Sequence, residues 1–153
     1  MVSVRSGLGR AARVLAVMTL ISLSACSSDS SPTAPEAGQT LKAHVLALLK
    51  TRGATDMKVI DPGGQNIACG DGKVKQTFGA TGKDSAGSTD AEALNTMLVG
   101  ALDRVAHYTV ISADSPGRPI RAVNEITKTA LIFESPGNGV YEVRGETDCL
   151  PAS

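Results

Sequence analysis

The first 25 residues constrain the fold most, because they have the layout of an export signal and not of a structural segment. Arg5, Arg10 and Arg13 lie among small residues, and a short apolar stretch follows at residues 14–23. Such a stretch is too short to span a bilayer as a permanent helix. We therefore expect residues 1–25 to be removed as a signal peptide, so that the folded domain forms from the rest of the chain.

A lipidation motif follows the apolar stretch. Leu23-Ser24-Ala25-Cys26 resembles the bacterial lipobox, in which the cysteine thiol is joined to diacylglycerol and the chain is cut just before it. The resemblance implies that Cys26 is the lipidated first residue of the mature protein. Several acyl chains, palmitate among them, would hold it stably on the extracytoplasmic face of the cell membrane. Two alternatives are an ordinary secretory signal with a chance cysteine and an uncleaved membrane anchor.

A polar segment separates this motif from the first apolar pattern. Residues 27–38 are rich in Ser, Pro and Ala and show no apolar periodicity. This composition predicts a flexible tether with an extended length of roughly 40 Å. We expect residues 26–38 to form the lipidated cysteine and tether, and residues 39–153 to form one domain.

The number of cysteines fits this arrangement. If Cys26 carries lipid, Cys69 and Cys149 are left as a pair in an oxidising compartment, which predicts one disulfide. Its loop of about 80 residues would stabilise the domain by about 4 kcal/mol in the chain-entropy model. The alternative is a metal site, but two cysteines without nearby histidine are too few ligands.

The charge of the mature chain differs from that of the whole sequence. The full chain has 15 basic and 15 acidic residues, and removing the three arginines of residues 1–25 leaves 12 basic and 15 acidic ones. Nucleic-acid binding depends on Lys and Arg that neutralise phosphates. We therefore expect no nucleic-acid partner.

Two helical patterns and several strand patterns follow the tether. Apolar residues recur at helical spacing over residues 40–52, with Gly53 after the last turn, and again over residues 90–106. Thr89 and Glu92 have the spacing of a capping box. Short strands are expected at residues 57–60, 67–69, 73–78, 108–112, 120–126, 129–134 and 140–147.

The order of these elements predicts the fold class. It reads approximately α-β-β-(β)-α-β-β-β-β, with turns rich in Gly, Pro and Asp, among them 115–119, between the strands. Runs of strands between two amphipathic helices are typical of α+β domains. We expect an antiparallel sheet with two helices packed on one face.

The chain resembles small actinobacterial secreted lipoproteins, including the mycobacterial LppA-like group. The shared features are a lipobox, a polar tether, a cysteine that enters a Gly/Asp turn, Phe78-Gly79-Ala80-Thr81, and a closing Gly145-Glu146-Thr147-Asp148-Cys149-Leu150. The resemblance implies the compartment, the disulfide and the fold. It carries no catalytic residue onto a position of this sequence.

The two histidines give no catalytic pattern. His44 follows Leu41 by three residues and is expected at the edge of the apolar helix face. His107 is expected at the C-terminus of the second helix, where it would interact favourably with the helix dipole; a catalytic role is the alternative. No nucleophile elbow, zinc-protease motif or phosphate-binding glycine loop is present in the sequence.

Three aspartates in predicted turns are candidate metal ligands. Asp56, Asp61 and Asp71 lie near glycines, but their spacing does not fit a calcium-binding EF-hand. Asp and Gly are ordinary turn residues. We therefore expect neither a metal nor another cofactor.

The strand charges and one polar segment are candidate interaction surfaces. Asp103 and Arg104 on the second helix are expected to be solvated, as are Glu142, Arg144 and Glu146, which alternate along the last strand and would protect a sheet edge. An interface at these strand charges is the alternative. The polar segment 79–88 is expected to be either a plain connector or a binding loop.

These features favour a membrane-tethered, non-catalytic module that binds an envelope ligand or a protein partner. The alternatives are an envelope-polymer hydrolase with an unrecognised carboxylate site and a structural surface protein without a specific ligand. Two converging acids of raised pKa would favour the hydrolase. An exposed apolar patch beside a sheet edge would favour a protein partner.

Overall fold

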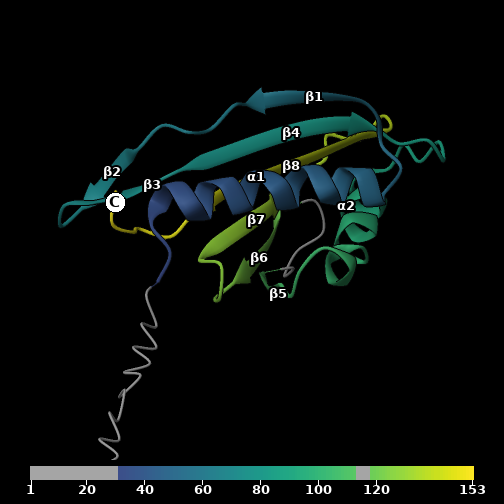
Figure 1. Cartoon of the computed structure of the whole chain (residues 1–153). Helices are drawn as coiled ribbons and strands as arrows, with labels where there is room; N and C mark the ends of the chain where they lie inside the picture. The colour runs from purple at the N-terminus through teal and green to yellow at the C-terminus, as the bar shows by residue number, and fades with distance from the viewer. Residues whose placement is uncertain (1–30, 113–117) are drawn as a thin grey trace, which may run out of the picture.

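The computed structural model describes residues 31–112 and 118–153, which form two helices and a sheet (Figure 1). Cys26, the signal segment and most of the predicted turn at 115–119 lie outside these residues. The helices are α1 (Ala34–Thr51) and α2 (Ala91–Val99), and a short 3₁₀ helix, η1 (Leu102–Arg104), follows α2. The strands are β1 (Thr55–Asp61), β2 (Ile67–Gly70), β3 (Lys73–Lys75), β4 (Thr77–Lys83), β5 (Thr109–Ser112), β6 (Ile120–Asn124), β7 (Thr129–Phe133) and β8 (Val140–Thr147).

The strands confirm the predicted α+β class. Six of them form one antiparallel sheet in the order β1-β4-β8-β7-β6-β5, and β2 pairs with β3 in a separate hairpin. The two helices pack on one face of the six-stranded sheet, and α1 lies across its middle strands (Figure 1). Because β8 pairs with both β4 and β7, the interpretation of the last strand as an edge is wrong.

Helix α1 begins earlier than the composition indicates. Thr33 caps it in a reciprocal capping box with Glu36, and Pro35 lies in the first turn, where its missing N–H costs no hydrogen bond. Ala34 and Ala37 are buried, so the start of the helix is part of the packed domain. The prediction that the tether extends to residue 38 is therefore wrong: the ordered domain starts at the cap.

Helix α2 is shorter than its apolar stripe. Its cap is Asp90, whose carboxylate accepts from the N–H of Ala93 at 2.7 Å, and not the predicted Thr89. The helix ends at Val99 because Gly100, a weak helix former, follows as the C-cap. The stripe continues past this point because η1 places Leu102 in the same core. The prediction of one helix over residues 90–106 is wrong in its second half.

Strand β4 includes residues that were expected to form a loop. Thr81, Gly82 and Lys83 pair with Glu142, Tyr141 and Val140 of β8. A side chain at Gly82 would come within 2.8 Å of the Ala54 side chain, so this glycine permits close strand packing. The interpretation of segment 79–88 as a connector or loop is wrong for residues 79–83, and only the segment after Lys83 connects β4 to α2.

The core lies between the helices and the sheet. A side chain at Gly145 of β8 would overlap the Leu41 side chain of α1 and the Ala130 carbonyl. Because glycine has no side chain, the helix can approach the sheet closely at this point. The largest fully buried side chains come from the sheet and both helices: Tyr141, Phe78, Phe133, Leu41, Leu48, Leu49, Leu94, Leu98 and Leu131.

The disulfide ties the β2–β3 hairpin to the C-terminal segment. The structure confirms the predicted bond between Cys69 of β2 and Cys149, whose Cα atoms lie 6.0 Å apart. The C-terminal segment also joins α1, because the N–H of Ala34 donates to the carbonyl of Pro151 at 2.8 Å. Leu150 packs with Ala34 in a small second cluster. In the part of the chain that the structure describes, no helix is long and apolar enough to cross a membrane.

Candidate binding face of the sheet

Strand β8 has two chemically different sides. Tyr141, Val143 and Thr147 point toward the helices and are buried. Glu142, Arg144 and Glu146 point to the opposite side, which neither helix of the described chain covers. We call this side the uncovered face. It comprises alternate residues of the central strands: Thr77, Gly79, Thr81, Arg121, Ala130, Ile132, Val140, Glu142, Arg144 and Glu146.

Glu146 is the centre of a charged cluster on the uncovered face. Lys75 contacts one carboxylate oxygen at 2.9 Å and Arg121 the other at 3.0 Å. Its hydrogen bond to Lys75, followed by that to Arg121, lowers the pKa of Glu146 although partial burial opposes this. The carboxylate therefore stays ionised and orients two cations on this face.

Arg144 forms the second ion pair of the face and lies next to a glycine. Its Nε donates to Glu142 at 2.7 Å, and its side chain is 51% exposed. Gly79 is its cross-strand neighbour on β4, and a Cβ there would lie 3.5 Å from Cγ of Arg144 and 3.2 Å from Ile60. Gly79 thus leaves room for the arginine stem to lie across β4.

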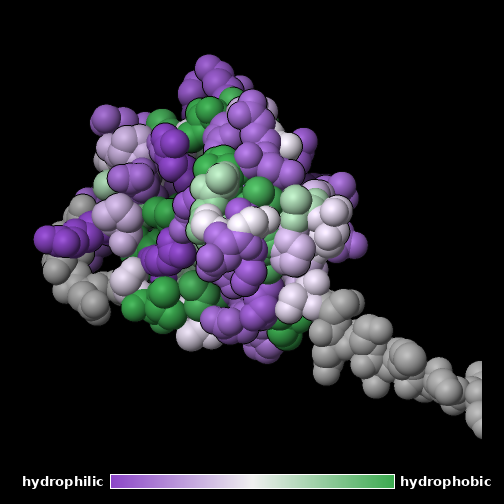
Figure 2. All heavy atoms as spheres, turned by 90° about the vertical axis from the view of Figure 1, so that its left-hand side faces the viewer, coloured by the Kyte–Doolittle hydropathy of each residue, from purple (hydrophilic) through white to green (hydrophobic). Residues whose placement is uncertain are grey.

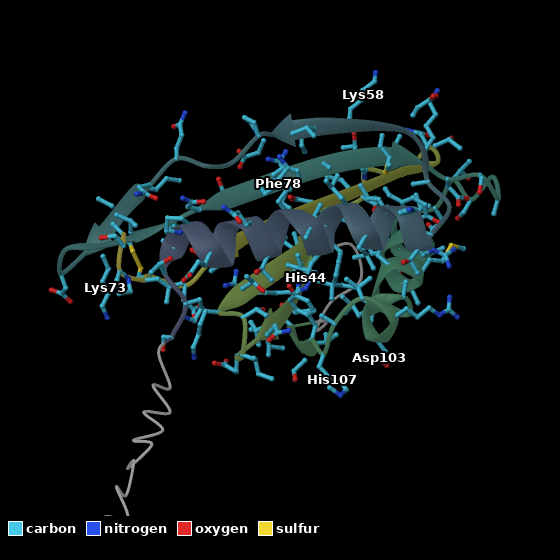
Figure 3. All side chains as sticks on the ribbon, viewed as in Figure 1. His44, Lys58, Lys73, Phe78, Asp103 and His107 are labelled. Atoms are coloured by element: carbon cyan, nitrogen blue, oxygen red, sulfur yellow. A yellow bond between two sulfur atoms is a disulfide. The ribbon has the colours of Figure 1, made fainter. Side chains whose placement is uncertain are left out.

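A shallow hollow of about 450 Å³ lies at the β1 end of this face. Asp56 adopts a left-handed conformation (φ 47°) where the pairing of β1 with β4 is irregular. It contacts Lys83 at 2.9 Å, and this hydrogen bond lowers the pKa of Asp56 and raises that of Lys83. Lys58 and Met57 line the same hollow, and Lys58 points outward (Figure 3). The hollow offers charged groups of both signs beside apolar surface.

His44 has a packing role. Its Nδ1 lies 2.9 Å from the Tyr108 hydroxyl, which in turn contacts Thr129 at 2.8 Å. Partial burial lowers the pKa of His44 and favours the neutral ring, while burial raises the pKa of Tyr108. The predicted position at the edge of the apolar face is confirmed, and the ring joins α1 to the sheet.

His107 lies on the surface. Its side chain is 95% exposed and 4.0 Å from Asp103 (Figure 3). Because α2 ends at Val99, His107 does not lie at the end of an α-helix, and the predicted interaction with a helix dipole is wrong. Asp103 is 87% exposed, and Arg104 is also exposed, as predicted.

The acidic turn residues do not converge. Asp61 accepts a hydrogen bond from the N–H of Gly63 at 3.0 Å, as in an Asx turn, and Asp71 lies in the β2–β3 turn with φ 51°. Asp56 contacts Lys83 instead. Residues 31–112 and 118–153 contain no group of three His, Cys, Asp or Glu side chains that could hold a metal ion.

A partly buried polar cluster, which the sequence did not indicate, fixes the remaining connector after β4. The Tyr141 hydroxyl donates to Asp84 at 2.7 Å and accepts from Arg52 at 3.3 Å. Asp84 also accepts from the N–H of Ser88 at 2.8 Å. The hydrogen bond from Tyr141 lowers the pKa of Asp84, and burial raises that of Tyr141. The segment 84–88 is therefore fastened to the core, which disfavours its interpretation as a mobile binding loop.

The fold was compared with those of solved structures, and the sequence with those of known proteins. No known family matches this sequence, and no curated protein matches it. The chain is similar to a DUF4853 family protein from Actinomyces odontolyticus ATCC 17982, whose crystal structure has been determined. The two share 17% sequence identity at a TM-score of 0.46, and the match covers 77% of this chain and 66% of the length of that protein.

Proposed function

We propose that this protein is a lipid-anchored, extracytoplasmic module that binds a protein partner through the uncovered face. The observation that carries the proposal is the arrangement of ion-paired side chains on β8, where Glu142, Arg144 and Glu146 all point away from the core. A rigid sheet holds these groups in a fixed pattern of alternating sign. Such a pattern favours recognition of a surface with complementary charges.

The anchor is supported by the use of the cysteines. Cys69 and Cys149 are joined to each other, which leaves Cys26 of the lipobox-like motif as the third cysteine. The domain begins at the Thr33 cap, seven residues after Cys26, an extended length of about 25 Å at most. The domain would therefore stay much closer to the membrane than a tether of 12 residues allows.

A hydrolase is less well supported by the carboxyl groups. A general acid in a glycosidase needs a raised pKa. Among the residues that the structure describes, the carboxyl groups with a shifted pKa are Glu36, Asp56, Asp84 and Glu146, and all four shift downward. Each is held as an anion by a hydrogen bond to a cation, a hydroxyl or the backbone. These groups suit ion pairing and capping better than proton donation.

Fractionation of the full chain tests the anchor. We expect the wild-type protein and the control Ser28→Ala to partition into detergent with a mass raised by diacylglycerol and an acyl chain. Cys26→Ser should be found in the aqueous phase without lipid. A wild-type protein without added lipid mass, or a Cys26→Ser protein that stays with membranes, contradicts the anchor.

Native mass spectrometry tests the binding face. The mature protein is incubated with envelope extract from its host, and we expect an adduct with the mass of a protein. Arg144→Glu should lose this adduct, whereas Lys50→Glu, a reversal at an exposed position of α1, should keep it. Loss from both variants, or from neither, contradicts the assignment to the uncovered face. A small-molecule adduct would replace the protein partner by an envelope ligand.

A further inference from the structure

An apolar side chain is exposed at the turn between β6 and β7. Ile126 is 82% exposed, more than any other large hydrophobic residue of the described chain. The side chains of similar type that are next in exposure, Ile111 at 54% and Val59 at 52%, lie on the edge strands of the sheet. Ile126 therefore differs from them in both exposure and position.

Hydrogen bonds to the rest of the domain hold the turn that carries Ile126 in place. The Asn124 side-chain oxygen accepts from the N–H groups of Ile126 and Thr127, both at 3.0 Å. The Lys128 carbonyl accepts from the N–H of Asp148 at 2.9 Å. Asn124 is buried, so the bonds begin at a fixed point of the sheet. The turn thus presents Ile126 outward on a braced backbone.

Ile126 lies beside the point where the chain enters the domain. It lines a hollow of about 400 Å³ together with Ser31, Pro32 and Glu36, which precede or begin α1. Figure 1 shows the β6–β7 turn at the same end of the molecule as the start of α1. Ser31 follows Cys26 by five residues, an extended length of about 17 Å. A lipid on Cys26 would therefore keep this turn near the bilayer surface.

We propose that the turn with Ile126 contacts the lipid surface and inserts the isoleucine at the boundary of headgroups and acyl chains. This inference rests on the proposed anchor at Cys26. The partner is a bilayer because the short segment between Cys26 and Ser31 brings the turn to it. An isoleucine on a braced turn adds apolar contact at no further ordering cost, since the turn is already fixed.

The charges around the turn define the kind of contact. Glu125 is 79% exposed and pairs with Lys128 at 3.5 Å, and Glu36 is used in the cap of α1. Figure 2 shows hydrophobic and hydrophilic residues mixed at the end of the molecule with the β2–β3 hairpin. The turn has no excess of cations, so its contact depends on apolar insertion. We therefore expect the turn to insert equally into zwitterionic and anionic bilayers.

The absence of tryptophan from the sequence allows a direct test. Ile126→Trp gives a single fluorescent reporter at the turn, and Val59→Trp gives a matched reporter on β1, at the upper rim of the sheet in Figure 1. Both lipidated full-length proteins are reconstituted into phosphatidylcholine vesicles with brominated acyl chains. We expect blue-shifted, strongly quenched emission from position 126 and unchanged emission from position 59.

Flotation of the same vesicles separates the two proposals. If both proteins float with the vesicles but position 126 is not quenched, the anchor stands and the lipid contact is overturned. Equal quenching at both positions also overturns it, because the orientation would then be unspecific. If neither protein floats, the anchor and the contact both fail. A quenching that increases with phosphatidylglycerol content would contradict an apolar contact.

Discussion

One side of β8 stabilises the core, and the other carries the charged side chains to which we assign recognition. On the helix side, Tyr141, Val143 and Gly145 meet α1 or α2, and a change in volume there affects the core. On the uncovered face, Arg144 and Glu146 meet other charged side chains and solvent. Close-packed interiors tolerate little change, whereas exposed ion pairs contribute little to folding. Substitutions at the exposed ion pairs of the uncovered face should therefore change the free energy of unfolding less than substitutions in the core.

The largest effect is expected on the helix side at Gly145. Gly145→Val places a branched side chain against Leu41 and the Ala130 carbonyl, which is backbone and cannot move aside. We expect a loss of about 3 kcal/mol, at the upper end for overpacking. Chemical denaturation monitored by circular dichroism measures this loss. A stability equal to that of the wild type would show that α1 does not approach β8 so closely.

A smaller effect is expected at the buried hydroxyl of the same side. Tyr141→Phe keeps the ring but leaves Asp84 and Arg52 without their shared partner. We expect a loss of about 2 kcal/mol, because a hydrogen bond to a charged group is removed. Amide hydrogen exchange of residues 84–88 should also increase. Unchanged exchange there would contradict the role of the cluster in fastening this segment.

On the uncovered face, Glu146 predicts a dependence on pH. Its pKa lies below the ordinary value of 4.5 in the folded protein, so its stabilisation is present above 4.5 and is lost as the pH falls through the folded value. Glu146→Gln should cost about 1 kcal/mol at neutral pH. The difference from the wild type should vanish in strong acid. A difference that persists in acid would point to altered packing and not to charge.

The smallest effect is expected at Arg144. Its side chain is 51% exposed and pairs only with a residue of its own strand among its described contacts. We expect Arg144→Ala to change the free energy of unfolding by less than about 0.5 kcal/mol. The same denaturation experiment measures this change. A loss as large as that of Tyr141→Phe would remove the contrast between the two sides of β8.

The sequence predicted the positions of the helices and strands better than the order of the strands in the sheet. The stripe of Leu41, Val45 and Leu48 gave the first helix, and alternation along β8 gave its two sides. Alternation does not tell which strands lie beside β8, so its central position was missed. Gly79 and Gly82 resemble loop residues, yet they lie in β4 where neighbouring side chains come close.

Some features of the structure could not be predicted because they depend on contacts between residues that are distant in the sequence. Tyr141 lies 57 residues from Asp84 and 89 from Arg52, and no local pattern brings these three together. The Ser/Pro composition before α1 concealed the Thr33 cap, because the same residue types serve in caps and in tethers. The cysteine pair was predictable because parity needs no knowledge of distance.

The central claim is that the uncovered face binds a protein partner. Its most direct test is photo-crosslinking of the intact protein in the cell envelope of its host. A photo-reactive benzoylphenylalanine replaces Ile132, which flanks Arg144 on the uncovered face, or Lys50, which is exposed on α1. We predict a covalent adduct of defined mass from position 132 and none from position 50. An adduct from position 50 alone, or none from either position, would contradict the assignment of binding to the uncovered face.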